Sequence, residues 1–208
     1  MKLYRFLKGM LLGLIKFLFR IKASGRENEP KDGAYIICSN HISFADVILI
    51  GAVIKRPVRF LAKAELFKIP VLGSFFKAMG AFPIKRGTAD VGAIKNSIKL
   101  LSQDEIVAVF IQGTRCSGID VSKTEAKSGA AMIAYRTGVP VLPIYIDTKN
   151  NKLKLFSRNT VRIGKLITAE EMAFDGGNKG EYDRVTQMIF DRIIELSEEA
   201  KSEREGKG

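Results

Sequence analysis

The sequence predicts a single α/β domain with a mixed, mainly parallel sheet flanked by helices, preceded by an amphipathic helix. Three observations support this prediction. Short apolar runs of strand length alternate along the chain with segments of helical periodicity, as they do in parallel sheets. The chain has 208 residues, 46% of them hydrophobic, which is enough for one compact core. No internal repeat or low-complexity segment breaks the alternation.

The first 22 residues, MKLYRFLKGMLLGLIKFLFRIK, have the pattern of an amphipathic helix. Six are Lys or Arg and none is acidic. At about 100° per residue, Lys2, Arg5, Lys16 and Arg20 share a narrow stripe beside a wide apolar face. This combination favours a helix that lies in a membrane interface, and the alternative is a helix packed in the core. We therefore expect a membrane-associated helix over residues 1–24 and one domain over residues 25–208.

This segment is unlike a membrane-spanning helix and unlike a cleaved signal peptide. The longest uncharged run, Gly9 to Ile15, is far shorter than the roughly 20 residues that a membrane-spanning helix needs. Charges interrupt the apolar run, and no small-residue cleavage site follows it, so we do not expect a cleaved signal peptide.

The expected elements of the domain follow a polar stretch from Ala23 to Gly33. The apolar runs predict strands over Ala34–Ser39, Val58–Ala62, Ala81–Ile84, Ile106–Ile111, Val141–Asp147, Leu153–Phe156 and Thr160–Ile163. The periodic segments predict helices over Ala45–Ile54, Val71–Met79, Ala89–Leu101, Ser128–Thr137 and Tyr182–Ala200.

The net charge of +12 lies almost entirely in the first half of the chain. Residues 1–104 contain 18 Lys and Arg and seven Asp and Glu, whereas residues 105–208 contain 16 and 15. Such a field attracts lipid head groups, an acidic carrier protein or nucleic acid. The aromatic residues do not alternate with cations as a base-stacking surface requires, so we expect no nucleic-acid partner.

The cysteines and the glycine patterns predict no metal and no bound cofactor. Cys38 and Cys116 have neither a zinc-site spacing nor the number typical of a disulfide scaffold, which favours a reduced cytoplasmic setting. The chain also lacks a P-loop and a dinucleotide-binding fingerprint.

His41, the only histidine, lies where a buried strand is expected to turn into a helix. Asp46 follows five residues later, in the first helical turn. A carboxylate bonded to one imidazole nitrogen fixes the tautomer and stabilises the imidazolium that forms when the other nitrogen takes a proton. The pair therefore predicts a general base that activates a hydroxyl group. The alternative is that Asp46 only complements the helix dipole and His41 is an ordinary polar neighbour.

Three further segments place glycine, cations or proline at strand ends. GAFPIKRG, residues 80–87, ends a strand with two cations, and the forked donors of Arg86 suit a phosphate. VFIQGTRC, residues 109–116, runs a strand into a glycine turn that can bring backbone amides close to an anion. GVPVLPI, residues 138–144, ends a helix at glycine and begins a strand after proline, and we expect it to be structural.

These segments, in this order, resemble the glycerolipid acyltransferase family that contains the lysophosphatidic acid acyltransferases. The family patterns are N-H-x-x-x-x-D, G-x-x-F-I-x-R, F-P-E-G-T-R-S and V-P-(I/V)-(I/V)-P-(I/V). They correspond here to NHISFAD, GAFPIKR, FIQGTRC and VPVLPI. The resemblance runs from about Tyr35 to Ile146, and four motifs in sequence are specific where the histidine motif alone is not.

The resemblance implies a role for each matching residue. His41 would be the general base and Asp46 its orienting partner. The acceptor-binding residues would be Lys63, Arg86, Gln112, Gly113, Thr114 and Arg115. Three positions depart from the third motif: Ile111 replaces Pro, Gln112 replaces Glu and Cys116 replaces Ser. Gln112 can donate and accept hydrogen bonds but carries no charge, which leaves the acceptor less certain than the reaction.

The resemblance also implies the reaction and its partners. An acyl chain would pass from an acyl-carrier protein or coenzyme A thioester to the free hydroxyl of a lysophospholipid, with 1-acylglycerol 3-phosphate giving phosphatidic acid in phospholipid biosynthesis. Glycerol 3-phosphate and other lysolipids are alternative acceptors, and a non-catalytic lipid-binding protein is the alternative function. A membrane surface would be a further partner, and the expected location is the cytoplasmic face of the cell membrane, with peripheral or monotopic attachment.

An acyl-enzyme route is a further alternative. It would need a nucleophile beside His41, and Ser43, Cys38 and Cys116 qualify by residue type alone. No G-x-S-x-G nucleophile elbow is present in the chain. Direct transfer between the two substrates is therefore the favoured route.

Overall fold

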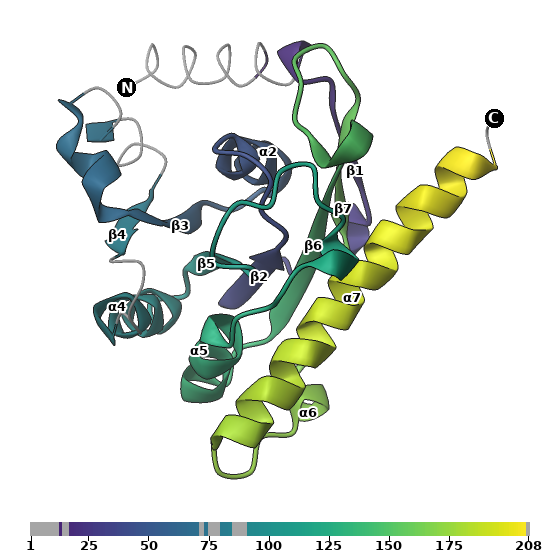
Figure 1. Cartoon of the computed structure of the whole chain (residues 1–208). Helices are drawn as coiled ribbons and strands as arrows, with labels where there is room; N and C mark the ends of the chain where they lie inside the picture. The colour runs from purple at the N-terminus through teal and green to yellow at the C-terminus, as the bar shows by residue number, and fades with distance from the viewer. Residues whose placement is uncertain (1–12, 14–16, 71–72, 75–79, 85–90, 207–208) are drawn as a thin grey trace.

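A computed structural model describes residues 13, 17–70, 73–74, 80–84 and 91–206 of the chain. Its centre is a seven-stranded sheet with the order β1-β7-β6-β2-β5-β3-β4 (Figure 1). The strands are β1 (Ile21–Ser24), β2 (Tyr35–Ser39), β3 (Val58–Lys63), β4 (Phe82–Ile84), β5 (Ile106–Phe110), β6 (Val141–Thr148) and β7 (Asn159–Ile163). All neighbouring strands are parallel except β6 and β7. The expectation of a mixed, mainly parallel sheet is confirmed.

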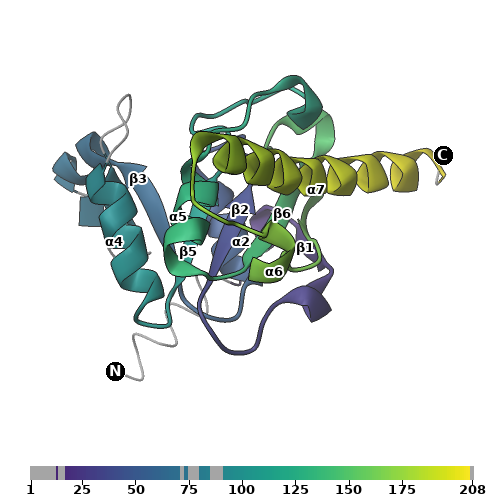
Figure 2. The same cartoon turned by 90° about the horizontal axis from the view of Figure 1, so that it is seen from below.

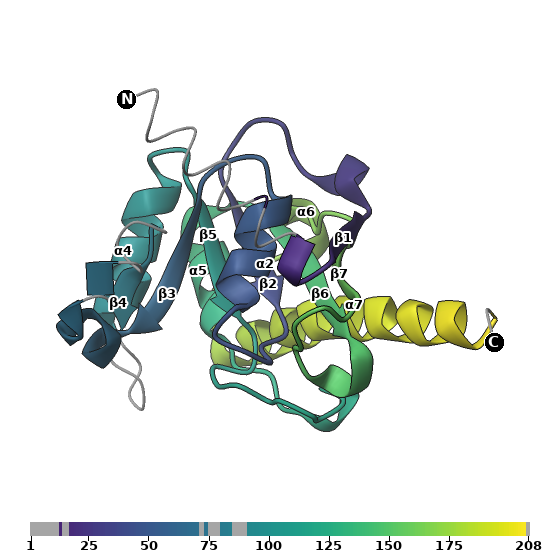
Figure 3. The same ribbon diagram turned by 90° about the horizontal axis from the view of Figure 1, so that it is seen from above.

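Helices cover both faces of this sheet (Figures 2 and 3). They are α2 (Asp46–Val53), α4 (Val91–Leu101), α5 (Gly129–Thr137), α6 (Ala169–Met172) and α7 (Lys179–Glu205), with short 3₁₀ turns η1 (Arg26–Asn28), η2 (Ala64–Lys68), η3 (Val121–Lys123) and η4 (Lys149–Asn151). Alternate residues of β2 enter two cores: Ile36 and Cys38 pack with α5 and α7, whereas Tyr35 and Ile37 pack with α2. Burial on both faces explains why β2 is a continuous apolar run.

The strand directions divide the loops between two edges of the sheet. The five parallel strands β2, β3, β4, β5 and β6 all end at one edge of the sheet. β7 runs antiparallel to β6, and β1 runs parallel to β7, so both of these strands begin at that edge. We call this the C-terminal edge; it carries loops 17–20, 40–45, 64–70, 111–128 and 149–158. The opposite edge carries loops 25–34, 54–57, 102–105, 138–140 and 164–178. Sites in parallel sheets form at the edge where strands end.

The end of the expected N-terminal helix differs from the structure. Residues 17–18 are helical, but Ile21–Ser24 form β1 and pair with β7 in the sheet. β7 would otherwise present unpaired backbone groups on this side, and the IKAS segment alternates half-buried and exposed residues as an edge strand does. The helix predicted for the preceding segment stays a prediction, because residues 1–12 and 14–16 lie outside the described part.

One expected strand is wrong, and one expected helix is largely untested. Leu153–Phe156 lies in the loop between β6 and β7, where Leu155 and Phe156 are exposed. Its alternation of lysine and apolar residues resembles a strand pattern, but β1 and β6 already flank β7, so this segment has no place beside the strand that follows it. The helix expected over Val71–Met79 falls mostly outside the described residues. Within the described residues, no helix is both long enough and apolar enough to cross a bilayer.

Candidate active site

Asp46 organises the turn that carries His41. One carboxylate oxygen, Oδ2, lies 2.7 Å from the ring Nδ1 of His41 and accepts the backbone N–H groups of Ile42 and Ser43 at 2.7 and 2.8 Å. His41 is 4% exposed and Asp46 is fully buried. A neutral imidazole that donates from Nδ1 to a carboxylate keeps its lone pair on Nε2. The expected contact between His41 and Asp46 is thus present, and the role of His41 as a general base stays a prediction.

The neighbouring strand β5 and the turn after it supply two further contacts to His41. Phe110 stacks on the imidazole, with ring centroids 3.9 Å apart and planes 11° from parallel. Gln112 accepts the backbone N–H of His41 through its Oε1 at 2.8 Å. The carbonyl of His41 in turn accepts the N–H of Cys116 at 2.8 Å. Since β2 and β5 are parallel neighbours, the turn after β5 is placed directly beside the turn after β2.

Asn40 fixes the other side of the turn that carries His41. Its amide donates to the carbonyl of Ile146 at 3.2 Å and accepts the N–H of the same residue at 2.7 Å. Asn40 is 2% exposed, so these bonds attach the residue before His41 to β6 without competition from water. The turn is thereby held between its two neighbouring strands. Sequence reasoning missed the roles of Asn40 and Phe110, although Asn40 opens the NHISFAD motif and Phe110 is paired in register with Ser39.

Gln112 is placed differently from its expected role in acceptor binding. It is 4% exposed, and its Nε2 donates to the Thr124 hydroxyl at 3.2 Å while its Oε1 holds His41. Both ends of the amide are therefore engaged inside the protein. The part in substrate binding stays a prediction, whereas the structure shows Gln112 holding the backbone of His41.

Gly113, Thr114 and Arg115 form the exposed turn after β5. Gly113 has φ +67°, a left-handed conformation that glycine adopts without strain. The Arg115 guanidinium carbon lies 3.6 Å from the centre of the Phe44 ring, three residues beyond His41. This cation–π contact places an exposed arginine beside the turn that carries His41. An exposed guanidinium beside this turn suits an anionic ligand.

The two remaining predicted site residues are only partly visible. Lys63 ends β3, which lies beside β5, but its side chain lies outside the described residues. Arg86 lies wholly outside them. Their roles stay predictions.

Neither thiol is set up as a nucleophile. Burial in the core raises the pKa of Cys38 to about 12. Desolvation also raises the pKa of Cys116. A reactive cysteine needs a lowered pKa, because the thiolate is the attacking species. Ser43 uses its hydroxyl oxygen to accept the N–H of Ala45 at 3.3 Å. These features favour direct transfer over an acyl-enzyme.

Comparison with known proteins agrees with this geometry. Residues 20–147 match the family model described as Acyltransferase. The chain is a member of this acyltransferase family. The match contains β2 with His41, α2 with Asp46, and the turn after β5. The resemblance read from the four motifs is therefore confirmed.

Several curated acyltransferases are similar over most of the chain. The 1-acyl-sn-glycerol-3-phosphate acyltransferase of Bacillus subtilis is 31% identical over 197 residues, which cover 93% of this chain and 96% of the relative. The protein of the same name from Escherichia coli is 26% identical over 96% of this chain and 84% of its own. The chloroplastic relative from Arabidopsis thaliana is longer, and the 34% identical match covers 61% of this chain and 35% of that protein.

A solved structure shares the fold of this acyltransferase. The crystal structure of the 1-acyl-sn-glycerophosphate acyltransferase of Thermotoga maritima matches with a TM-score of 0.67 and 26% sequence identity. The match covers 87% of this chain and 72% of the other. The similarity supports a common arrangement of sheet and helices.

Proposed function

We propose that this acyltransferase moves a fatty acyl chain from an acyl thioester to the free hydroxyl of 1-acylglycerol 3-phosphate, giving phosphatidic acid. The observation that carries the proposal is the 2.7 Å contact between His41 Nδ1 and Asp46 Oδ2. The family membership supports acyl transfer. The names of the relatives from Bacillus subtilis and Escherichia coli support the acceptor.

The proposed reaction is one direct transfer with a single base. Nε2 of His41 takes the proton of the acceptor hydroxyl as its oxygen attacks the thioester carbonyl. The tetrahedral adduct then collapses, the carbon–sulfur bond breaks, and the imidazolium returns the proton to the leaving thiolate. Asp46 stabilises the imidazolium between these steps. A positioned acid–base group contributes typically about 10²–10⁴-fold to the rate.

Binding of the acceptor is proposed to rest on its phosphate. Arg115 is exposed and packs beside Phe44, which lies three residues after His41 in the chain. The forked donors of Arg115 suit two phosphate oxygens. Lys63 and Arg86 are the further proposed phosphate ligands, on the basis of the family motifs. Phosphate held at this edge would place the glycerol hydroxyl near the imidazole, and such positioning supplies much of the catalytic advantage.

The donor and the location are further parts of the proposal. An acidic acyl-carrier protein and the phosphates of coenzyme A both suit the basic half of the chain. The basic, apolar segment over residues 1–22 supports attachment to a membrane surface, in a peripheral or monotopic manner on the cytoplasmic face. Apolar burial and attraction to anionic lipid would act together there.

The test is identification of the product by mass. Purified protein is incubated with each donor and with 1-acylglycerol 3-phosphate, glycerol 3-phosphate or another lysolipid. We expect phosphatidic acid from the first acceptor. A product formed only from another acceptor would replace the proposed substrate, and no product from any pair would favour a non-catalytic lipid-binding protein.

The catalytic pair has its own test. His41→Ala and Asp46→Asn are expected to lower kcat by about 10²–10⁴-fold, because the first removes the base and the second removes the charge that stabilises the imidazolium. Circular dichroism and thermal unfolding check that the fold persists. Normal turnover by folded His41→Ala protein would remove this histidine from the mechanism.

A further inference from the structure

The exposed apolar side chains are concentrated at one edge of the molecule. Seven large hydrophobic residues of the described part are exposed, by 47–72%: Phe17, Phe44, Ile69, Val91, Ile119, Leu155 and Phe156. Six lie in the loops of the C-terminal edge, and Val91 begins α4 at the same edge. Scattered exposed hydrophobic residues are normal on soluble proteins, but their concentration on one side indicates a contact surface.

The charges of the loops divide in the same way. The described loops of the C-terminal edge contain nine Lys and Arg and three Asp and Glu, whereas those of the opposite edge contain five and eight. All nine cations are exposed: Arg20, Lys68, Arg115, Lys123, Lys127, Lys149, Lys152, Lys154 and Arg158. Apolar side chains among exposed cations complement a surface that is apolar inside and negatively charged outside, which describes an anionic bilayer.

The loop 149–158 extends beyond the ends of β6 and β7 at this edge (Figure 1). Leu155 is 55% exposed and Phe156 is 60% exposed. Phe156 also has φ +60°, a conformation that favours glycine or asparagine and is costly for a bulky side chain. Neither core packing nor turn geometry therefore accounts for a phenylalanine at this position.

The loop is joined to the segment that leads to the N-terminus. The N–H of Phe156 donates to the carbonyl of Leu18 at 2.7 Å, and the side-chain amide of Asn159 donates to the carbonyl of Phe19 at 2.6 Å. Phe17 and Phe156 line the same hollow, together with Arg20 and Lys22. The two segments thus place apolar and cationic side chains around one surface hollow.

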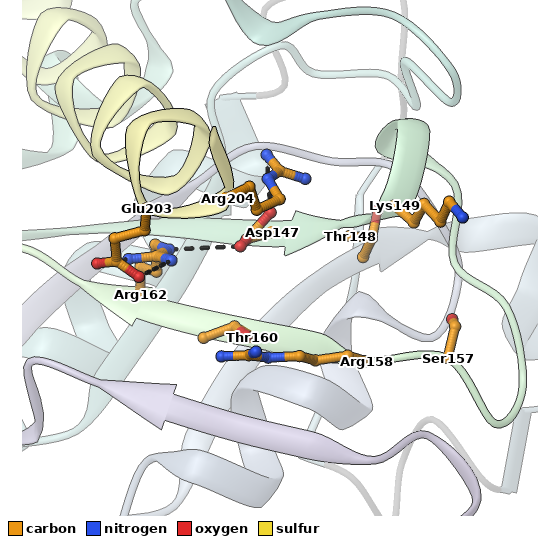
Figure 4. A pocket seen from close by; sticks show the side chains of 9 residues that line it. All are labelled: Asp147, Thr148, Lys149, Ser157, Arg158, Thr160, Arg162, Glu203 and Arg204. Carbon is orange, nitrogen blue, oxygen red and sulfur yellow. Dashed lines mark hydrogen bonds and ion pairs between the residues drawn. The ribbon is translucent and has the colours of Figure 1, made fainter. Parts of the chain in front are cut away.

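Two cations of the loop are available to an anionic partner. Lys149 and Arg158 line a pocket of about 350 Å³ at the ends of β6, β7 and α7 (Figure 4). Its carboxylates, Asp147 and Glu203, are already paired with arginines of the pocket. Among the described residues, none is paired with the side chain of Lys149 or of Arg158.

We propose that the C-terminal edge docks on an anionic phospholipid bilayer, with Leu155 and Phe156 entering the membrane beside Phe17. His41 lies in a loop of the same edge, so this orientation turns the catalytic turn toward the membrane, where a lysophospholipid acceptor resides. α7, with eight Asp and Glu and five Lys and Arg, packs on the face opposite α2. The inference rests on the proposed membrane attachment and is independent of the acyl-transfer reaction.

A single tryptophan can report the orientation, because the chain contains none. Phe156→Trp places an indole in the loop, and the matched Phe174→Trp places one in loop 164–178 of the opposite edge. Each full-length variant is mixed with phosphatidylglycerol vesicles, without donor or acceptor. We expect a blue shift and quenching by brominated lipid for the indole at position 156 and neither change at position 174. Equal quenching at the two positions, or none at position 156, would overturn the orientation.

A pair of charge reversals tests the electrostatic part on the same vesicles. Lys149→Glu/Lys154→Glu changes the C-terminal edge, and Lys31→Glu/Lys165→Glu makes the same change in net charge at exposed sites of the opposite edge. We expect the first pair to weaken vesicle binding by roughly 30-fold or more and the second by much less. Equal losses would show that net charge alone drives binding and would contradict a defined docking edge. Because no turnover is measured, failure here is distinct from failure of the proposed reaction.

Discussion

Three residues determine how the imidazole of His41 is held. Asp46 orients the ring through Nδ1, Gln112 holds the backbone N–H, and Phe110 covers one ring face. The arrangement is buried, so each bond acts in a low-dielectric setting and its loss is costly. Gln112 therefore acts by holding the backbone of His41 in place. It does not supply the negative charge that a glutamate has at this position of the family motif.

Gln112→Leu is expected to lower both kcat and stability. It leaves the buried N–H of His41 without its acceptor, which costs about 1–3 kcal/mol and allows the catalytic turn to shift. Gln112→Glu keeps an acceptor oxygen and is the matched control, expected to retain most of the turnover. Steady-state kinetics and denaturant unfolding measure the two effects. Equal activity of Gln112→Leu and wild type would contradict the positioning role.

The thiols offer a second residue-scale prediction. Burial raises the pKa of Cys38, which keeps this thiol protonated near neutral pH, and its complete burial also blocks access by a reagent. In native protein, iodoacetamide is expected to modify Cys116 slowly and Cys38 not at all; in denaturant it should modify both. Peptide mass spectrometry reads the sites. Rapid labelling of Cys38 in the native state would restore it as a candidate nucleophile.

At the scale of elements, the connection after β1 depends on a close approach to β7. Gly25 has φ +71°, and a Cβ there would lie 2.0 Å from the carbonyl oxygen of Ile163. Asn28 donates to the same carbonyl at 3.0 Å. The glycine thus allows the chain to leave the sheet edge and return toward β2.

Gly25→Ala is expected to destabilise the protein more than Gly33→Ala. Both glycines have positive φ, but nothing lies within 4 Å of a Cβ at Gly33. The control should therefore cost only the conformational penalty, about 1–2 kcal/mol, whereas Gly25→Ala must also move the backbone. Denaturant unfolding measures both free energies. Similar losses would mean that the edge at β1 rearranges freely.

At the scale of the whole molecule, the chain has two unlike edges. The C-terminal edge carries His41, the exposed apolar residues and an excess of cations. The opposite edge is acidic and has no exposed large hydrophobic residue in its described part. This polarity arises because parallel strands end together, so that loops far apart in sequence meet at one edge. The segment before β1 leads into the C-terminal edge, where it can add to a membrane contact.

Phe6→Asp/Leu14→Asp is expected to release the full-length protein from membranes. Both side chains belong to the apolar face predicted for residues 1–22, and two carboxylates there would oppose burial next to anionic lipid. Fractionation after cell lysis measures the change, and turnover of acceptor in detergent micelles is expected to remain. Complete membrane retention would show that the segment is not needed for attachment.

The sequence determined the reaction class and most of the scaffold. The evidence came from local features: the four motifs, the order of the apolar runs, and the five-residue spacing of His41 and Asp46. Local features can be recognised in a sequence without its three-dimensional structure. Only the tertiary structure placed Phe110, Gln112 and Asn40 around His41, made Ile21–Ser24 a strand, and excluded Leu153–Phe156 from the sheet. These features depend on pairing between distant segments and on which sheet positions are already filled, and such competition for partners cannot be read from spacing within one segment.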